Sequence, residues 1–174
     1  VLDYMKLRAS YGMVGNDNIG GERFFYESRW GGGGDAKFGI NKGGTGNGGG
    51  LKEVRNGNPG LTWETAHKFN FGFDSRWFNN RFEWTTDVFY EKRTNILTNI
   101  DIVPATYGGP AITANAGKVE NKGIELDGTW HERLNKNFDY FVGGMFSFAR
   151  NKILERPETP RAYPYLQQVG YRVG

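Results

Sequence analysis

The sequence predicts an all-β protein of antiparallel up-and-down strands that form a partial segment of a transmembrane β-barrel. Three observations predict it: apolar and polar residues alternate along several strand-length segments, short polar turns join some of these segments, and long connections join the others. Alternation with a period of two sorts side chains onto two faces of a strand, which a helix of period 3.6 cannot do. A membrane barrel wall has this pattern, with lipid against one face and a polar lumen against the other.

The first expected strand covers about residues 4–14, and a long loop follows over 15–64. In the strand, Met5, Leu7, Ala9, Tyr11 and Met13 alternate with Lys6, Arg8, Ser10 and Gly12. The loop contains two glycine clusters, 31–34 and 43–50, which predict flexible and irregular backbone. One alternating stretch in the loop suggests an additional short strand, at Phe24, Tyr26 and Ser28.

The next two strands, about 66–78 and 81–92, show the alternation most clearly. In the first of them one face carries Phe69, Phe71, Phe73, Ser75 and Trp77. In the second, Phe82, Trp84, Thr86, Val88 and Tyr90 share a face, and Phe89 is a misfit on the other.

Asn79-Asn80 is expected to form a two-residue hairpin turn of type I′ between these strands, because Asn tolerates the positive φ that this turn requires. Pairing across the turn stacks apolar residues on one face and opposite charges on the other, so one register satisfies both. The expected pairs are Trp77 with Phe82, Phe73 with Thr86, Phe71 with Val88, Phe69 with Tyr90, Arg76 with Glu83, and Lys68 with Glu91.

A second long loop is expected over 93–118, followed by strands at about 119–132 and 137–151. These two strands also alternate, and the polar stretch Arg133-Leu134-Asn135 is expected to be their turn. The expected register places Trp130 opposite Phe138 and Leu126 opposite Val142, with Tyr140 covering Gly128.

The lengths of the connections give the expected sheet an orientation. The turns at 79–80 and 133–135 lie on one side, and the loops 15–64 and 93–118 lie on the other. Outer-membrane barrels have short inner turns and long outer loops, so this parity favours a barrel. Aromatic residues near the short turns resemble an interfacial girdle, and the alternative is that they pack the core of a β-sandwich. They are Trp77, Phe78, Phe82, Trp84, Trp130, Phe138 and Tyr140.

Composition sets further bounds. Five strands cannot close a bacterial barrel, and the chain starts in mid-pattern without Met or a signal peptide, so we expect a fragment of a larger protein. The net charge of +3 is mild and interspersed, which argues against nucleic acid as a partner. With 0 Cys, the chain has no disulfides, thiol catalysis or cysteine metal sites.

The polar residues do not predict a catalytic or metal site. The glycine clusters lack the Gly-Lys-Ser or Gly-Lys-Thr of a phosphate-binding loop, and nothing in the pattern brings His67 and His131 together as metal ligands. Polar-face carboxylates are expected to form a salt-bridged wall, while three others have no partner and are solvated by lumen water: Asp87, Glu125 and Asp127. We therefore expect no catalytic residue, no metal, no cofactor and no enzyme.

Aromatic residues in the long loops are the remaining candidates for a site. Tyr26 and Trp30 lie in loop 15–64, and Tyr107 lies in loop 93–118. Exposed aromatic rings in loops stack on sugars or cover a partner's surface, so we expect these three to contact a substrate or partner. The alternative is that each ring folds back and anchors its own loop.

Several segments resemble a known family. They are KLRASYGMVGN (6–16), NPGLTWE (58–64), FYEKRTNIL (89–97), NAGKVENKGIEL (115–126), FSFARNKIL (146–154) and the tail 165–174, which ends VGYRVG. Together and in this order they resemble barrel segments of SusC/RagA-type TonB-dependent outer-membrane transporters of Bacteroidetes. The resemblance covers most of the chain apart from the glycine-rich residues 31–57.

This resemblance implies a barrel of about 22 strands with a plugged lumen in the outer membrane of a Gram-negative, Bacteroidetes-like cell. It also implies import of large nutrients such as glycans or peptides, powered through TonB, with a SusD-like surface lipoprotein closing the outer face. TonB would act through a plug domain that is absent from this sequence. The present residues would supply barrel wall, in contact with outer-membrane lipid, and outer loops.

Two other functions remain open at this point. A soluble all-β carbohydrate-binding module, such as a lectin-like sandwich, predicts that the Phe and Trp faces pack on another sheet within this chain. A receptor or adhesin barrel without transport predicts the same wall but no plug domain. An enzyme is the weakest alternative, because no pair of carboxylates is held at a set separation.

Overall fold

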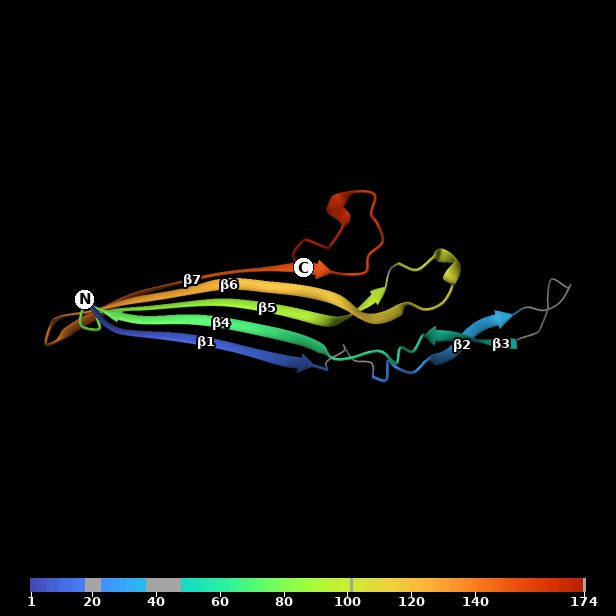
Figure 1. The fold of residues 1–174 in the computed structure, drawn as a ribbon, viewed down its shortest axis with the longest axis horizontal. Helices are drawn as coiled ribbons and strands as arrows, with labels where there is room; N and C mark the ends of the chain where they lie inside the picture. Colours follow the sequence, from blue (N-terminus) through green and yellow to red (C-terminus); the bar gives the residue numbers. More distant parts are fainter. Residues whose placement is uncertain (18–22, 37–47, 101, 174) are drawn as a thin grey trace.

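The computed structural model describes residues 1–17, 23–36, 48–100 and 102–173, and this part of the chain is nearly all β (Figure 1). Its strands are β1 (Leu2–Asn16), β2 (Arg29–Ala36), β3 (Gly48–Arg55), β4 (Glu64–Trp77), β5 (Phe82–Ile100), β6 (Ile112–Asn135) and β7 (Phe138–Glu155). Two short 3-10 helices are η1 (Ala105–Tyr107) and η2 (Pro164–Leu166). Among these residues, no helix has the length and apolar character needed to cross a membrane.

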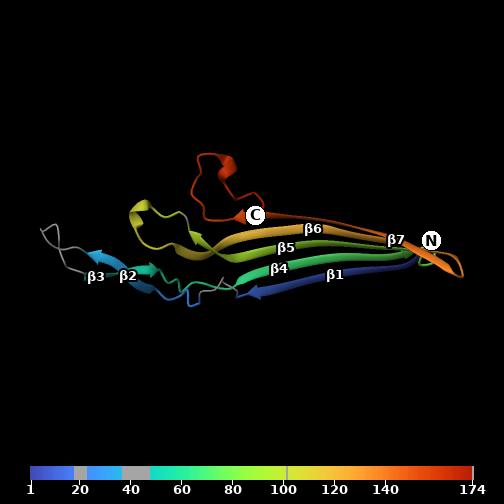
Figure 2. The same ribbon diagram turned by 180° about the vertical axis from the view of Figure 1, so that it is seen from behind.

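The strands form one antiparallel sheet in the order β1-β4-β5-β6-β7 and a separate β2-β3 hairpin. Figures 1 and 2 show the sheet as a single long layer, with the short turns and the N-terminus at one end and the β2-β3 hairpin beyond the other. β1 and β7 are the two edges, so the sheet is open, as expected for a partial barrel segment. We call its two ends the short-turn end and the long-loop end.

The sheet has almost no buried core. Among the described residues, Ala66 is the one buried hydrophobic residue and Ser75 the one buried polar residue, whereas Phe69 is 46% and Phe71 40% exposed. No second sheet of the described chain covers these rings, because the β2-β3 hairpin lies beyond the long-loop end of the sheet (Figures 1 and 2). The interpretation of the aromatic faces as a sandwich core is therefore wrong for the described part of the chain.

The two faces of the sheet differ as the alternation predicts. One row of paired residues on the apolar face consists of Leu7, Phe73, Thr86, Leu126 and Phe146. The adjacent row on the polar face consists of Arg8, Gly72, Asp87, Glu125 and Ser147. We call the apolar face over residues 71–77, 82–88, 124–130 and 142–148 the apolar band.

Polar groups within the apolar band bond to one another. The Trp77 indole donates to the Ser75 hydroxyl at 3.0 Å, and the Trp84 indole donates to the Thr86 hydroxyl at 2.8 Å. A lipid environment offers no water to satisfy such groups, so internal bonding is what this face requires. Ser75, which interrupts an aromatic face in the sequence, is thereby explained.

The predicted register of the first hairpin is confirmed. β4 and β5 pair Trp77 with Phe82 and Arg76 with Glu83, and the same register continues to Lys68 with Glu91. The turn differs from the prediction, because the strands end at Trp77 and Phe82 and leave four residues between them. Phe78 adopts φ 59° alongside Asn79 at 60° and Asn80 at 59°, so the left-handed stretch begins one residue earlier than expected.

The predicted register of the second hairpin is wrong. The structure pairs Leu126 with Phe146 and Trp130 with Val142, because the turn lies at residues 136–137 instead of 133–135. An Asx turn explains the shift, since the Asn135 side-chain oxygen accepts a 2.9 Å hydrogen bond from the Asn137 amide. The shift is even, so every side chain keeps its face.

Because of this shift, Gly128 has a different neighbour from the one predicted. It pairs with Gly144 and not with Tyr140. The ring that covers it is Trp84, whose Cε3 would lie 3.0 Å from a Cβ at this position.

The strands extend further toward the long-loop end than expected. β5 runs to Ile100 and β6 begins at Ile112, so the second loop is shorter than 93–118. The first loop contains β2 and β3, and β2 includes glycines 31–34, which were expected to be irregular. The suggested strand at Phe24, Tyr26 and Ser28 is a turn instead. Part of the second glycine cluster, 43–47, lies outside the described residues.

Candidate functional site

Asn115, near the start of β6, joins three segments at the long-loop end. Its side-chain nitrogen donates to the carbonyls of Thr62 and Asn95, each at 2.7 Å, and its side-chain oxygen accepts from the Thr62 amide at 2.8 Å. Asn supplies both donors and an acceptor, which this double contact with Thr62 requires. The loop before β4 is thereby attached to the sheet.

Asn95 supplies one of these carbonyls because β5 is irregular there. The register shifts between Arg93 and Ile96 and again at Leu97, and Asn95 has a φ of 58°. Asn adopts the left-handed conformation more readily than most residues, and an extra residue of this kind bends a strand locally. The bulge places the Asn95 carbonyl within reach of Asn115.

Asn58 makes the second attachment. Its side chain donates to the Thr113 carbonyl at 3.0 Å, and its side-chain oxygen accepts from the Gly60 amide at 3.0 Å. The turn that follows brings Trp63 against β1, where a Cβ on Gly15 would lie 3.2 Å from the indole. The two segments NPGLTWE and NAGKVENKGIEL, which were noted separately in the sequence, therefore contact each other.

Arg55, at the end of β3, holds the start of the first loop. Its guanidinium donates to the carbonyls of Phe24 at 2.9 Å and Glu27 at 3.3 Å, and it lies 5.1 Å from the centre of the Phe25 ring. The Asn58 amide also donates to the Phe25 carbonyl at 3.0 Å. These contacts order the turn that contains Tyr26.

The three predicted loop aromatics are exposed but separate. Tyr26 is 53%, Trp30 64% and Tyr107 41% exposed. The Tyr107 hydroxyl accepts a 3.2 Å hydrogen bond from Asn56 and so links the two loops, whereas Tyr26 contacts the ring of Phe24 edge-on at 6.0 Å. No hydrogen bond or ring contact between described residues joins any two of the three.

On the polar face, Arg8 connects two strands that follow it in the sheet. It donates two hydrogen bonds to Asp74, at 2.8 and 3.0 Å, and a third to Asp87 at 2.9 Å. Gly72 leaves room for this guanidinium, because a Cβ there would lie 2.6 Å from Arg8 Cζ. The expectation that Asp87 lacks a partner is therefore wrong.

The remaining charge pairs match the predicted wall. Arg76 contacts Glu83 at 3.2 Å and Lys68 contacts Glu91 at 3.7 Å. Asp127 and Glu125 are exposed on the same face. The carboxylates of this face are spread along the sheet, and four of them (Asp74, Glu83, Asp87 and Glu91) are paired with cations, so they form a polar wall and not a general acid with its base.

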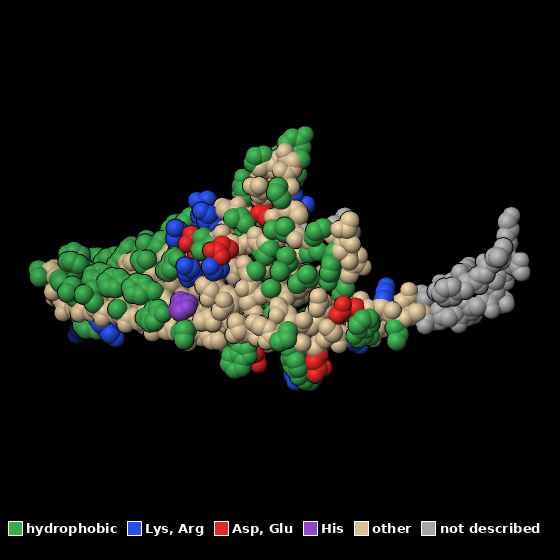
Figure 3. All heavy atoms as spheres, turned by 45° about the vertical axis from the view of Figure 1, so that its right-hand side comes forward, with side chains coloured by type: hydrophobic (Ala, Val, Ile, Leu, Met, Phe, Trp, Pro, Cys, Tyr) green, Lys and Arg blue, Asp and Glu red, His purple; other side chains and the backbone are tan. Residues whose placement is uncertain are grey.

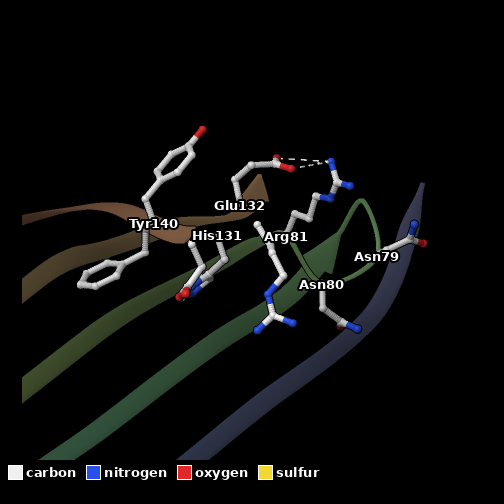
Figure 4. Close-up of a pocket in the computed structure, with 9 residues that line it drawn as sticks. Asn79, Asn80, Arg81, His131, Glu132 and Tyr140 are labelled. Atoms are coloured by element: carbon white, nitrogen blue, oxygen red, sulfur yellow. Dashed lines mark hydrogen bonds and ion pairs between the residues drawn. The ribbon is translucent and has the colours of Figure 1, made fainter. Parts of the chain in front are cut away.

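A small open hollow lies at the short-turn end, between the two short turns. Figure 4 shows Arg81 paired with Glu132, with His131 and Tyr140 beside them; the ion pair is 3.1 Å long. His67 lies at the opposite end, where its Nδ1 is hydrogen-bonded to the Tyr11 hydroxyl at 2.8 Å. The two histidines are thus far apart, and the described residues contain no group of three or more His, Asp or Glu side chains placed to hold a metal ion.

The sequence that forms this sheet, with its tight turns and long loops, matches a known family. The model of that family, described as TonB dependent receptor-like, beta-barrel, matches residues 1–171. This chain belongs to the TonB-dependent receptor-like β-barrel family. Barrels of this family lie in the outer membrane of Gram-negative bacteria, so we refer to the polar face as the lumen face below.

Curated relatives agree with this assignment. The TonB-dependent receptor P39 of Formosa agariphila is 30% identical over 162 residues, which cover 88% of this chain and 14% of the relative. The TonB-dependent receptor SusC of Bacteroides thetaiotaomicron is 26% identical over 161 residues, with 88% and 15% covered. These relatives are receptors and not enzymes, as the sequence predicted. The chain spans about one seventh of their length.

Solved structures share the fold. The RagAB peptide importer in its open-open state superposes with a TM-score of 0.74 at 24% identity, and 98% of this chain covers 18% of the importer chain. The closed-closed state gives a TM-score of 0.70 with the same coverage. The predicted fold class, a partial antiparallel segment of a transmembrane barrel, is confirmed.

Proposed function

We propose that this chain forms part of the wall and outer loops of a TonB-dependent importer of large nutrients, which works with a SusD-like surface lipoprotein. One observation carries the proposal: a single sheet has an apolar band on one face, a salt-bridged polar wall on the other, and long loops at one end only. A wall between lipid and a polar lumen has this arrangement. Membership of the TonB-dependent receptor family supports the direction of transport and the energy source.

In this proposal the chain lies in the outer membrane of a Bacteroidetes-like cell, with the long loops facing outward. TonB acts through a plug domain elsewhere in the protein, and the lipoprotein closes over the loops. Substrate is held between the lipoprotein and the barrel and is released inward when the plug rearranges. The lumen face, with its paired and solvated charges, lines the route.

The loop aromatics are the proposed contacts to substrate or lipoprotein. Trp30 is the strongest of them, because its ring is 64% exposed on β2, beyond the end of the sheet. Tyr26 is held on an ordered turn, and Tyr107 bridges the two loops through Asn56. Exposed Tyr and Trp rings supply a large contact area at low conformational-entropy cost.

Growth tests decide the substrate class. The complete gene is deleted in its host, and growth is compared on single polysaccharides and on peptides as the limiting nutrient. Loss of growth on one class, restored by the intact gene, identifies the cargo. Normal growth and uptake on every nutrient, in a strain that has lost a surface-binding property, would contradict import and favour the adhesin alternative.

Alanine substitutions test the loop contacts. The triple change Tyr26→Ala, Trp30→Ala and Tyr107→Ala in the full-length protein is expected to lower uptake without lowering the amount of folded barrel. Tyr165→Ala is the matched control, because this tyrosine is 71% exposed in the C-terminal tail and stacks only on Tyr163 among the described rings. Equal uptake by the triple variant and the control would contradict a role for the three rings.

A further inference from the structure

A group of cations lies on the apolar face, directly beyond the long-loop end of the apolar band. The last row of the band pairs Val88, Ile124 and Phe148. The next two rows on the same face contain four cations, which we call the cationic cluster: Lys92, Lys122, Arg150 and Lys152. Successive rows on one face are about 6.6 Å apart along a strand, so the change from rings to cations is abrupt.

The cluster has little internal compensation. One carboxylate, Glu120, lies among the cations; it pairs with Lys122 at 4.0 Å and accepts a 3.4 Å hydrogen bond from the Tyr90 hydroxyl. The side chains of Lys92, Arg150 and Lys152 make no hydrogen bond or ion pair with any described residue. Figure 3 shows blue and red side chains gathered at the border of the green band on this face.

The tail adds a further cation and a wall. It returns to β7, where the Ile153 amide donates to the Tyr171 carbonyl and the Gly170 amide donates to the Ile153 carbonyl, each at 2.8 Å. A hollow between the tail and the end of β7 is lined by Phe148, Lys122, Arg150, Lys152, Tyr171 and Arg172, with Glu120 and Asn151 as its other polar side chains. Its lining therefore combines four cations with one carboxylate and with the rings of Phe148 and Tyr171.

Lipid phosphate matches this position and chemistry. At the outer border of a barrel the headgroups of the outer leaflet lie beside the wall, and their acyl chains lie beside the apolar band. Lys ammonium and Arg guanidinium groups bind phosphate strongly, and guanidinium binds it in a two-pronged geometry. The lumen-face cations differ, because Arg8, Lys68 and Arg76 already have carboxylate partners.

We propose that Lys92, Lys122, Arg150 and Lys152 bind the phosphate of an outer-leaflet lipid, whose acyl chains lie on Ile124 and Phe148. This inference rests on the proposed function only in placing the sheet in the outer membrane with its long loops outward. The barrel wall would then hold one lipid at a fixed place, whereas the rest of the apolar band would contact lipid without selectivity.

The test uses the full-length protein in nanodiscs that contain a small fraction of monophosphoryl lipid A. Retained lipid is counted by native mass spectrometry for the wild type and for the double variant Arg150→Gln and Lys152→Gln. The control, Arg133→Gln and Lys136→Gln, removes the same charge at the short-turn end. Removing two cations at the lipid surface is expected to weaken retention by about tenfold to thirtyfold, with no change in the control.

Two further arms identify the group that is bound. Dephosphorylated lipid A is expected to be retained equally by the wild type and the double variant, and inorganic phosphate is expected to displace lipid from neither. Single variants at Arg150 and Lys152 are measured in parallel, so that a fold defect in the double variant does not decide the outcome.

Equal retention of the phosphorylated lipid by the folded double variant and the wild type would overturn the proposal. So would a wild-type mass that shows two protein copies and no lipid, since the cluster would then be an interface between copies. Nutrient uptake is measured in the same strains, because loss of lipid selectivity with normal uptake separates this inference from the proposed function.

Discussion

The apolar band and the long-loop end of the sheet are held together by different interactions. In the band the strands pair without a register shift, and aromatic rings lie on one face of the sheet while charged side chains lie on the other. At the long-loop end the backbone has a bulge, and Asn58, Asn95 and Asn115 attach the loops through specific hydrogen bonds. In the band, the surrounding lipid or water determines which residue types lie on each face. At the long-loop end, the backbone geometry and its hydrogen bonds determine which residues occur.

The largest expected effect comes from a charge placed on the apolar band, and it tests whether lipid surrounds this face. Phe71→Lys places a charge in the apolar band and is expected to cost about 2–4 kcal/mol of folding free energy in a bilayer. Asn70→Lys, one residue away on the lumen face, is expected to change it by less than about 0.5 kcal/mol. The measurement is the fraction of full-length protein that stays folded in lipid vesicles across a urea series, and equal costs at both positions would break the comparison.

The second prediction tests packing within the band region. A Cβ on Gly123 would lie 2.5 Å from both the Phe148 carbonyl oxygen and the Phe89 ring, so Gly123→Ala forces the backbone or the ring to move. We expect a cost of about 1–3 kcal/mol in the same urea series. Gly12→Ala is the control on the same face, because nothing lies within 4 Å of its added Cβ. If Gly123→Ala left the folding free energy unchanged, β6 and β7 would be packed loosely enough here to accept a methyl group.

The third prediction concerns the loop attachment. Asn115→Ala removes the amide that bonds Thr62 and Asn95, and the local opening free energy of residues 58–64 is expected to fall by about 1–2 kcal/mol. Hydrogen exchange of the Thr62 amide in the full-length protein measures this directly, as a faster rate. Asn121→Ala is the control, because its side chain makes no hydrogen bond with a described residue. Unchanged exchange in Asn115→Ala would contradict the attachment.

The smallest expected effect depends on pH. Glu158 in the tail accepts backbone hydrogen bonds from Gln168 at 2.9 Å and Val169 at 2.9 Å, and these bonds lower its pKa below the ordinary value. A lowered folded-state pKa means that the contact is fully present above the unfolded-state pKa and is lost as the pH falls through the folded-state pKa. Protection of the Gln168 and Val169 amides should therefore fall in acid, and Glu158→Gln should remove this pH dependence. If acid did not change the protection of these two amides in the wild type, their hydrogen bonds to the Glu158 carboxylate would be contradicted.

Period-two alternation was sufficient to predict the fold class and the face of each residue, because solvent contrast imposes it on every strand of the wall. The register of β4 and β5 also followed from the sequence, since charge pairs and rings agreed on one alignment and the Asn79-Asn80 turn limited the choice. The register of β6 and β7 did not, because Asn135 and Asn137 form the turn and the alternation permits any even shift.

Contacts between strands distant in the chain could not be predicted. The pairing of β1 with β4 joins segments with a long insertion between them, so the Arg8 bonds to Asp74 and Asp87 had no local signal. The Asn115 attachment was missed for the same reason, although the NPGLTWE and NAGKVENKGIEL segments that it joins were both noted. Phe89, a misfit in the alternation, is explained only by Gly123 on the neighbouring strand.

Cysteine labelling tests most directly the claim that the two faces contact different solvents. The chain has 0 Cys, so single cysteines at Phe71 and Asn70 can be introduced into the full-length protein in outer membranes, once any other cysteines have been replaced. Each is labelled with a lipid-soluble and a water-soluble thiol reagent. We predict that position 71 reacts only with the lipid-soluble reagent and position 70 only with the aqueous one. Labelling of both positions from water, or of neither, would contradict a barrel wall.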